Sequence, residues 1–320
     1  MNAAAAKKFY SVLIFVLCAV MLFLPAAAIK PEAGASDIVK LAPTDKDYFR
    51  VLITDTGKVE KIGRTEYLFG TVASEMGADC PAEALKAQAV ACYTYALYRK
   101  NENSDKDYDL TDSPDTDQKY QSRAVLMQKW GDNAEKYAAA VDSAVSQTLG
   151  YVITDADGAP ILAAYHAVSS GRTESAQVVW GQDYDYLQPV ESIGDLLSPD
   201  YLSVRKFTEA ELAEKLSEKV ALTGDASAWI GGVDYSDSGT VISYTFGGTK
   251  IEGSYIRDAL GLRSAAFDVS YKDGEFVFNV KGWGHGVGMS QYGARYLAST
   301  GSTFVEILSH YYTGCKMKKL

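Results

Sequence analysis

Small and apolar residues recur every three or four positions after Pro81, which predicts a long amphipathic helix running toward Lys100. Proline suits the first helical position, because its missing N–H would have no partner there. The stripe consists of Leu85, Ala89, Cys92, Ala96 and Arg99. Glu75 precedes the helix and lies outside this stripe, so the pattern predicts a carboxylate in a turn between a short element and the helix. A solvated side chain and a functional one both fit such a turn.

Apolar runs separated by turn-forming residues predict a β-rich region as well. Hairpins are predicted for residues 49–53 with 58–62, 151–154 with 161–166, and 267–271 with 276–280. Further strands are predicted at 233–235, 241–246 and 250–252, and further helices at 132–147, 208–220 and 254–260. We therefore expect an α+β fold in which a helical lobe carrying Glu75 packs on a β-rich lobe.

The composition limits the classes of function. With 320 residues, 47% of them hydrophobic, the chain can bury a large core in one long domain or two packed lobes. Its formal net charge of -10 argues against a nucleic-acid partner, because binding phosphates needs a basic surface. Cys80, Cys92 and Cys315 form an odd set in the part expected to be exported, so we expect mostly free, buried cysteines.

The N-terminal sequence predicts an export signal. Lys7 and Lys8 precede an uncharged apolar run, residues 9–24, which small residues follow. A cleavable signal peptide and a retained membrane anchor both fit this pattern. The expected organisation is a cytoplasmic stub (1–8), a transmembrane signal-anchor (9–29), a linker (30–47) and an extracytoplasmic domain (48–320), which places the protein at the cell membrane with one N-terminal anchor.

Three loops differ in the chemistry they offer. SSGRTE, residues 169–174, follows a predicted strand and presents hydroxyls, amides and a guanidinium group that suit a sugar or a carboxylate, although a simple turn also fits. GWGHGVG, residues 282–288, has four glycines in seven residues and predicts a loop packed against a ligand cleft. Residues 101–119 contain six aspartates but lack the glycine and the terminal glutamate of a calcium loop, so we expect a solvated connection.

The histidines leave a metal-dependent alternative. His166, His285 and His310 could gather with Glu75 in a zinc hydrolase. No two of them have the close spacing of a zinc-binding helix, so we expect no metal and no cofactor.

Three motifs together resemble the stage II sporulation protein D family. They are ASEMGADCPAEALKAQAVACYTYAL around Glu75, SSGRTE at 169–174 with VWG at 179–181, and GHGVGMSQYGA at 284–294. They occur in the family's order, and the resemblance covers about residues 48–314. Two positions depart from the family pattern, Tyr93 where an arginine is usual and Ser170 where a glycine is usual.

The resemblance implies a lytic transglycosylase that cleaves peptidoglycan between MurNAc and GlcNAc and leaves 1,6-anhydroMurNAc, in septal wall remodelling during engulfment. Glu75 would serve as the single catalytic acid and base, in a glycan cleft between the two lobes, and burial there would raise its pKa. A non-catalytic amidase enhancer or glycan-binding protein is the alternative.

The same resemblance implies residues that hold the glycan. They are Lys86, Ser169, Arg172, His285 and Gln291; for Lys86, covering the helix surface fits equally well. The implied partners are peptidoglycan glycan strands and the stage II sporulation proteins M and P.

Overall fold

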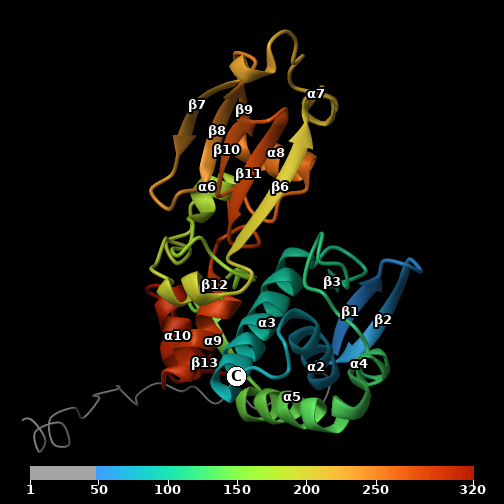
Figure 1. The fold of residues 1–320 in the computed structure, drawn as a ribbon. Helices are drawn as coiled ribbons and strands as arrows, with labels where there is room; N and C mark the ends of the chain where they lie inside the picture. Colours follow the sequence, from blue (N-terminus) through green and yellow to red (C-terminus); the bar gives the residue numbers. More distant parts are fainter. Residues whose placement is uncertain (1–47) are drawn as a thin grey trace, which may run out of the picture. The chain divides into compact units, whose positions relative to one another are not determined.

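The computed structural model describes residues 48–320 (Figure 1). The expected stub (1–8), signal-anchor (9–29) and linker (30–47) lie outside the described residues. Within residues 48–320, no helix is both long and apolar enough to cross a bilayer. The longest, α3 (Ala82–Glu102), carries charged residues such as Glu83 and Lys100. The expected localisation at the cell membrane is corrected to this extent: residues 48–320 contain no helix that could serve as its anchor.

The helical lobe begins with the predicted hairpin. Strands β1 (Tyr48–Ile53) and β2 (Lys58–Gly63) pair antiparallel, and β3 (Leu110–Thr111) adds a parallel strand to β1. The helices of this lobe are α2 (Arg64–Glu75), α3, α4 (Arg123–Trp130), the short η1 (Gly131–Asn133) and α5 (Ala134–Thr148). The predicted hairpin and both predicted helices of this region are confirmed.

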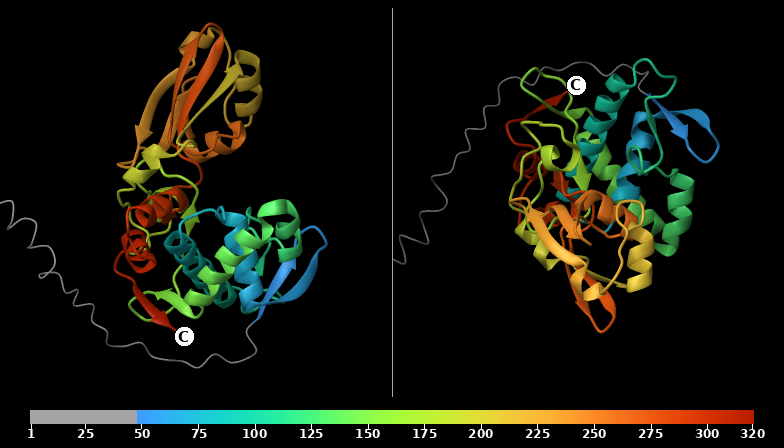
Figure 2. Two further views of the ribbon diagram at one scale, coloured as in Figure 1. Left: turned by 60° about the horizontal axis from the view of Figure 1, so that its bottom comes forward. Right: turned by 90° about the horizontal axis from the view of Figure 1, so that it is seen from above.

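Helix α3 is buried on more than the one stripe that its sequence predicts. Leu85 and Cys92 belong to a core shared with α2 and α5, whereas Ala87, Val90 and Ala91 belong to a second core shared with the C-terminal helices α9 (Gln291–Ser299) and α10 (Phe304–Tyr311). Figure 1 and Figure 2 show α3 between these two groups of helices. Small side chains on both faces let the helices approach closely, so α3 joins the two halves of this lobe.

The segments after α5 pair with the C-terminus of the chain. β4 (Tyr151–Thr154) is antiparallel to β13 (Lys316–Lys319), and β5 (Tyr165–His166) is parallel to β12 (Met289–Ser290). The predicted hairpin of 151–154 with 161–166 is therefore wrong. The turn between them forms, but only Thr154 and Pro160 make a β-bridge, because the chain then leaves to pair with distant strands. The short α6 (Ala176–Trp180) and η2 (Ile193–Leu197) complete this region.

The β-rich lobe contains two three-stranded antiparallel sheets. One has the order β10–β11–β6 and the other β7–β8–β9. The strands are β6 (Leu202–Thr208), β7 (Ile230–Tyr235), β8 (Val241–Phe246), β9 (Thr249–Glu252), β10 (Phe267–Lys272) and β11 (Glu275–Lys281). Its helices are α7 (Glu209–Leu216), η3 (Ala226–Ala228) and α8 (Gly253–Leu260). The predicted capping box between Thr208 and Glu211 is present. Aromatic residues such as Trp229 and Phe276, which stack, fill the core, and the α+β class is confirmed.

Candidate functional site

Glu75 is the last residue of α2, not a turn residue as its sequence context predicts. Gly70 lets this helix pass directly against Tyr120 and Gln121, because a Cβ atom on Gly70 would collide with both. The backbone becomes extended at Met76 and turns toward α3. The C-terminal end of α2 thereby brings the Glu75 side chain against the segment that ends the acidic loop.

The carboxylate of Glu75 is partly buried and held by one backbone group. Its Oε1 accepts a hydrogen bond from the Lys119 N–H at 2.6 Å. Burial raises the pKa of Glu75, although this hydrogen bond, the charge of Lys119 and the Tyr165 hydroxyl each act to lower it. Loss of water around a carboxylate penalises its charged form, which gives the net direction. As expected from the resemblance, Glu75 therefore keeps its proton to higher pH than an ordinary glutamate.

The acidic loop is more than the solvated connection expected from its sequence. The side chain of Asp117 is buried, and its Oδ1 accepts from Arg99 Nε at 2.6 Å and from the Tyr95 hydroxyl at 3.2 Å. Asp109, also buried, pairs with Arg50. Buried carboxylates are stable only when they are paired and hydrogen-bonded in this way. These two aspartates fix the end of the loop, and so fix the Lys119 amide beside Glu75.

Gln118 connects the loop to three neighbours. Its Nε2 donates to the Tyr67 hydroxyl at 3.1 Å and to the Cys92 carbonyl at 3.2 Å, and its Oε1 accepts from the Tyr165 hydroxyl at 3.0 Å. Gln118 is 2% exposed, so all these groups depend on one another for partners. Gln118 and Tyr165 have no local signal in the sequence, because a polar loop carries no periodicity and Tyr165 lies on a strand of only two residues.

A cavity of about 740 Å³ opens beside Glu75. The loop supplies Asp115, Asp117 and Gln118, β5 supplies Tyr165 and His166, and α6 supplies Trp180. The remaining walls include Arg257 of α8, Trp283, Gly284 and His285 of the glycine loop, and Gln291 of α9. Elements from both lobes thus line the cavity beside Glu75.

The glycine loop reaches the cavity because it packs on β5 without side chains in between. A Cβ atom on Gly288 would collide with the Ala164 carbonyl, and one on Gly284 would lie 2.8 Å from the His166 Cβ; both glycines have positive φ. The glycines therefore allow a close approach of the two backbone segments. It sets the His285 ring 5.7 Å from the His166 ring and 5.1 Å from the Trp180 ring.

Both histidines of the cavity are neutral near pH 7. Burial lowers the pKa of His285 to about 3, helped by repulsion from His166 and Arg257, and burial also lowers the pKa of His166. His166 Nδ1 lies 3.1 Å from the Val287 carbonyl, so Nδ1 carries the proton, and Nε2 is a buried acceptor with no partner among residues 48–320. These rings offer hydrogen bonds and stacking surface, not charge.

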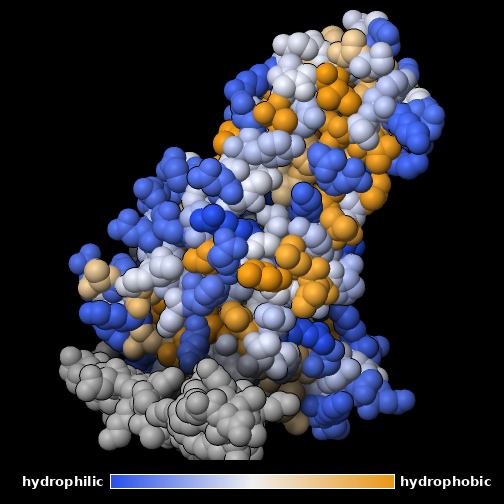
Figure 3. Space-filling model, turned by 60° about the vertical axis from the view of Figure 1, so that its left-hand side comes forward, coloured by the Kyte–Doolittle hydropathy of each residue, from blue (hydrophilic) through white to orange (hydrophobic). Residues whose placement is uncertain are grey.

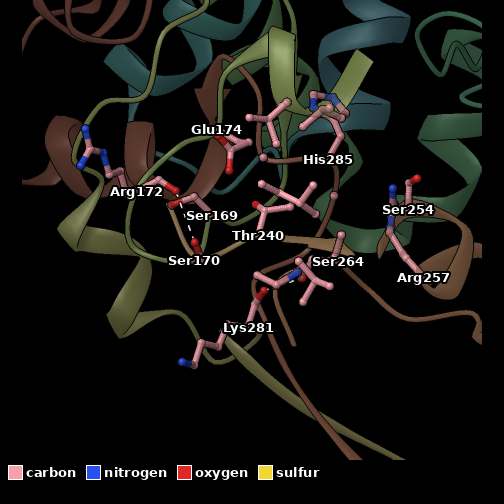
Figure 4. Close-up of a pocket in the computed structure, with 18 of the residues that line it drawn as sticks. Ser169, Ser170, Arg172, Glu174, Thr240, Ser254, Arg257, Ser264, Lys281 and His285 are labelled. Atoms are coloured by element: carbon pink, nitrogen blue, oxygen red, sulfur yellow. Dashed lines mark hydrogen bonds between the residues drawn. The ribbon is translucent and has the colours of Figure 1, made fainter. Parts of the chain in front are cut away.

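The structure brings only some of the predicted site residues together. Glu75, His285 and Gln291 line the large cavity. Ser169 and Arg172 line a second cavity of about 300 Å³, which His285 also lines (Figure 4). Lys86 lines neither; its Nζ lies 2.7 Å from Glu83 Oε1, which matches the structural alternative for this lysine.

Ser169 is a connecting residue in the structure. Its N–H and its hydroxyl donate to Asp195 Oδ2 at 2.9 and 2.5 Å, and the Ser290 hydroxyl donates to Asp195 Oδ1 at 2.7 Å. Asp195 of η2 therefore ties the SSGRTE loop to the start of α9. Arg172 is more exposed, and its Nε lies 3.9 Å from Glu191 Oε1.

The three histidines do not gather as the zinc alternative requires. His310 Nε2 contacts the Glu191 carbonyl at 2.7 Å, apart from the cavity that His166 and His285 line. In the described part of the chain, no group of three or more histidine, cysteine, aspartate or glutamate side chains is placed to hold a metal ion. Cys80, Cys92 and Cys315 are free, as expected, but only Cys92 is fully buried.

The chain that places this acid at a helix end beside the glycine loop matches a known class of sporulation proteins. The family model described as Stage II sporulation protein matches residues 53–154, which contain Glu75.

Similar proteins that align with most of the chain identify the family within this class. The chain is 36% identical to Stage II sporulation protein D of Bacillus amyloliquefaciens, over 90% of this chain and 83% of the relative. It is 33% identical to Stage II sporulation protein D of Bacillus subtilis (strain 168), over 98% of this chain and 96% of that one. The chain belongs to the stage II sporulation protein D family, which confirms the resemblance. It is also 28% identical to Amidase enhancer of Bacillus subtilis (strain 168), over 77% of this chain and 39% of the relative.

Proposed function

We propose that this protein is a lytic transglycosylase that cleaves the MurNAc–GlcNAc bond of peptidoglycan, in septal wall remodelling during engulfment. Membership of a sporulation family supports the setting. The proposed reaction is supported chiefly by the position of Glu75. This partly buried carboxyl group has a raised pKa and lies on the wall of a cavity large enough for sugar rings. Aromatic and amide side chains around it, such as Trp180 and Gln291, suit sugar faces and hydroxyls.

One carboxyl group suffices for this reaction. Protonated Glu75 gives its proton to the glycosidic oxygen, the bond from that oxygen to MurNAc C1 breaks, and GlcNAc leaves with a 4-hydroxyl group. The Glu75 carboxylate then accepts the proton of the MurNAc C6 hydroxyl while O6 bonds to C1. The product is 1,6-anhydroMurNAc, the acid is restored, and no water is consumed. A raised pKa makes the first step effective near neutral pH.

Two further carboxylates line the cavity and need separate roles. Both oxygens of Asp117 accept hydrogen bonds, Oδ1 from Arg99 and Tyr95 and Oδ2 from the Thr111 N–H at 2.9 Å. Asp117 therefore acts as an anchor of the loop. Asp115 is exposed. If a second carboxylate activated water, the product would carry a reducing end and not an anhydro end.

The chemical structure of the released glycan fragments tests the proposal. Purified protein is incubated with isolated glycan strands, and the released fragments are analysed by mass spectrometry. We expect fragments that end in 1,6-anhydroMurNAc, lighter by one water than hydrolysis products. Fragments with reducing ends would replace the transglycosylase by a hydrolase. No fragments at all, with strands still bound, would favour the glycan-binding or amidase-enhancer alternative.

We expect the cleavage rate to fall as pH rises through the raised pKa of Glu75, because the acid form starts the reaction. The Tyr165 hydroxyl lowers that pKa, so Tyr165→Phe should move the falling limb of the profile to higher pH. Tyr235→Phe, on β7 outside the cavity, should leave the limb in place. Initial rates measured against pH for the three proteins test this. An unmoved limb in Tyr165→Phe would contradict the link between the two side chains.

The proposed partners are stage II sporulation proteins M and P. A surface suited to protein partners lies over η2 and β6, where Ile193 is 65% exposed, Leu197 66% and Leu202 61%. Figure 3 shows apolar side chains at the surface of the lobes. Several exposed large apolar residues within reach of one another are typical of interaction sites. An amidase-enhancing role, as in the name of the more distant relative, would use such a surface without needing Glu75.

A further inference from the structure

The second cavity adjoins the cavity of Glu75. Its walls come from the SSGRTE loop, α6, β8, the start of α8 and the glycine loop (Figure 4). Three residues line both cavities: Arg257, Gly284 and His285. A ligand beside Glu75 can therefore extend past these residues into the second cavity.

Arg257 is an unpaired cation at this junction. It lies on α8, its Nε is buried, and that nitrogen has no hydrogen-bond partner among residues 48–320. No carboxylate of the described chain forms an ion pair with its guanidinium group. A buried N–H group in a protein normally has a hydrogen-bond partner, because losing water costs free energy that a partner must restore. The missing partner is the observation to explain.

The other charged groups of the second cavity are already satisfied or turned away. Glu174 accepts from the Ser236 hydroxyl at 2.5 Å and from the Ser175 N–H at 2.8 Å. In Figure 4 the charged ends of Arg172 and Lys281 point away from the middle of the cavity, and Arg257 lies on the opposite side from Arg172. Glu252 is exposed to water. Arg257 is thus left as the cation that faces both cavities without a protein anion.

We propose that Arg257 is a specificity-determining residue that binds a carboxylate of the glycan strand whose scissile bond lies at Glu75. This inference rests on the proposed function. A guanidinium group binds a carboxylate through two parallel hydrogen bonds, which suits a planar anion better than a neutral sugar hydroxyl. In a chain of net charge -10, an anionic strand also needs a local cation to be held. The carboxylate comes either from the lactyl group of a bare MurNAc or from the end of a stem peptide.

The experiment compares Arg257→Gln and Arg257→Lys with the wild type on three substrates: strands freed of stem peptides, strands that carry them, and strands whose carboxyl groups are reduced to alcohols. Arg257→Gln should raise KM about tenfold or more on the strands with the recognised carboxylate, with kcat little changed, as expected for one lost charge-assisted interaction. Arg257→Lys should lose less. On reduced strands, wild type and Arg257→Gln should have the same KM.

Controls separate this inference from folding and from catalysis. Arg205→Gln, an exposed arginine on β6, should behave as wild type, and melting temperatures show whether Arg257→Gln is folded. Binding of the same strands to Glu75→Gln and to Glu75→Gln with Arg257→Gln, followed by tryptophan fluorescence, reports on Arg257 without cleavage. If strands bind but are never cleaved, the transglycosylase fails while this comparison still decides the role of Arg257.

The outcomes are distinct. A KM effect confined to peptide-free strands assigns the lactyl carboxylate, and one confined to peptide-bearing strands assigns the stem peptide. An equal loss on reduced strands, or no loss on any strand, would overturn the carboxylate site.

Discussion

The Glu75→Gln variant is expected to release 1,6-anhydroMurNAc ends at least about a hundredfold more slowly than the wild type, because it removes the proton that starts the reaction. Glutamine keeps the size of the side chain and its carbonyl oxygen still accepts from the Lys119 N–H, so the fold around it should be unchanged. The measurement is the rate of anhydro-end formation by mass spectrometry, at equal protein concentration.

Two further variants make this test specific. Glu60→Gln, an exposed glutamate on β2, removes the same charge from the same half of the chain and should cleave like the wild type. Glu75→Asp keeps the acid but withdraws it by one methylene, so it should retain only part of the rate. Identical products from the wild type and Glu75→Gln would end the enzyme interpretation. Enhancement of an amidase that persists in Glu75→Gln would then support the alternative function.

Asp195→Ala is expected to lower the free energy of unfolding by about 3 kcal/mol or more, the largest stability effect we predict for a single side chain of the site. Asp195 is fully buried, and its loss leaves the Ser169 N–H, the Ser169 hydroxyl and the Ser290 hydroxyl without their acceptor. Each buried donor then carries the cost of lost hydration with nothing in return. The SSGRTE loop and the start of α9 should separate as a result, and cleavage should fall with them.

Denaturant unfolding of matched variants tests this. Asp195→Asn keeps one carbonyl acceptor and should lose less stability than Asp195→Ala. Ser290→Ala removes one donor to Asp195 and also the N-cap hydrogen bond that the Ser290 hydroxyl accepts from the Gly293 N–H, so its cost should be about 2 kcal/mol, still below that of Asp195→Ala. If Asp195→Ala unfolds at the wild-type denaturant concentration, the connection between the two loops does not stabilise the fold.

Local sequence signals were reliable where one segment contains all the partners it needs. The hairpins of β1 with β2 and of β10 with β11 join neighbouring strands, and the Thr208 capping box bonds residues three positions apart. Their turns and alternation are visible without any knowledge of the rest of the chain. The same holds for α3, which the periodicity after Pro81 predicts, although that pattern showed only one of its two buried faces.

The pairing of strands that lie far apart along the chain could not be predicted from the sequence in this way. His166 pairs with Ser290, and Thr154 pairs with Lys316, so strands of two to four residues are completed by partners far away in sequence. A strand this short carries too little alternation to choose its partner. For this reason the predicted hairpin of 151–154 with 161–166 failed, although both strands and the turn between them were expected.

The sequence by itself determined the family, the α+β class and Glu75 as the candidate acid, because motifs, turns and helix periodicity are local properties. Only the tertiary structure placed Glu75 at the end of a helix, set the Lys119 amide on its carboxylate and buried it enough to raise its pKa. It also separated Lys86 from the cavity and set Arg257 unpaired at the junction of two cavities. Burial and long-range hydrogen bonds are properties of the packed chain, which no single segment encodes.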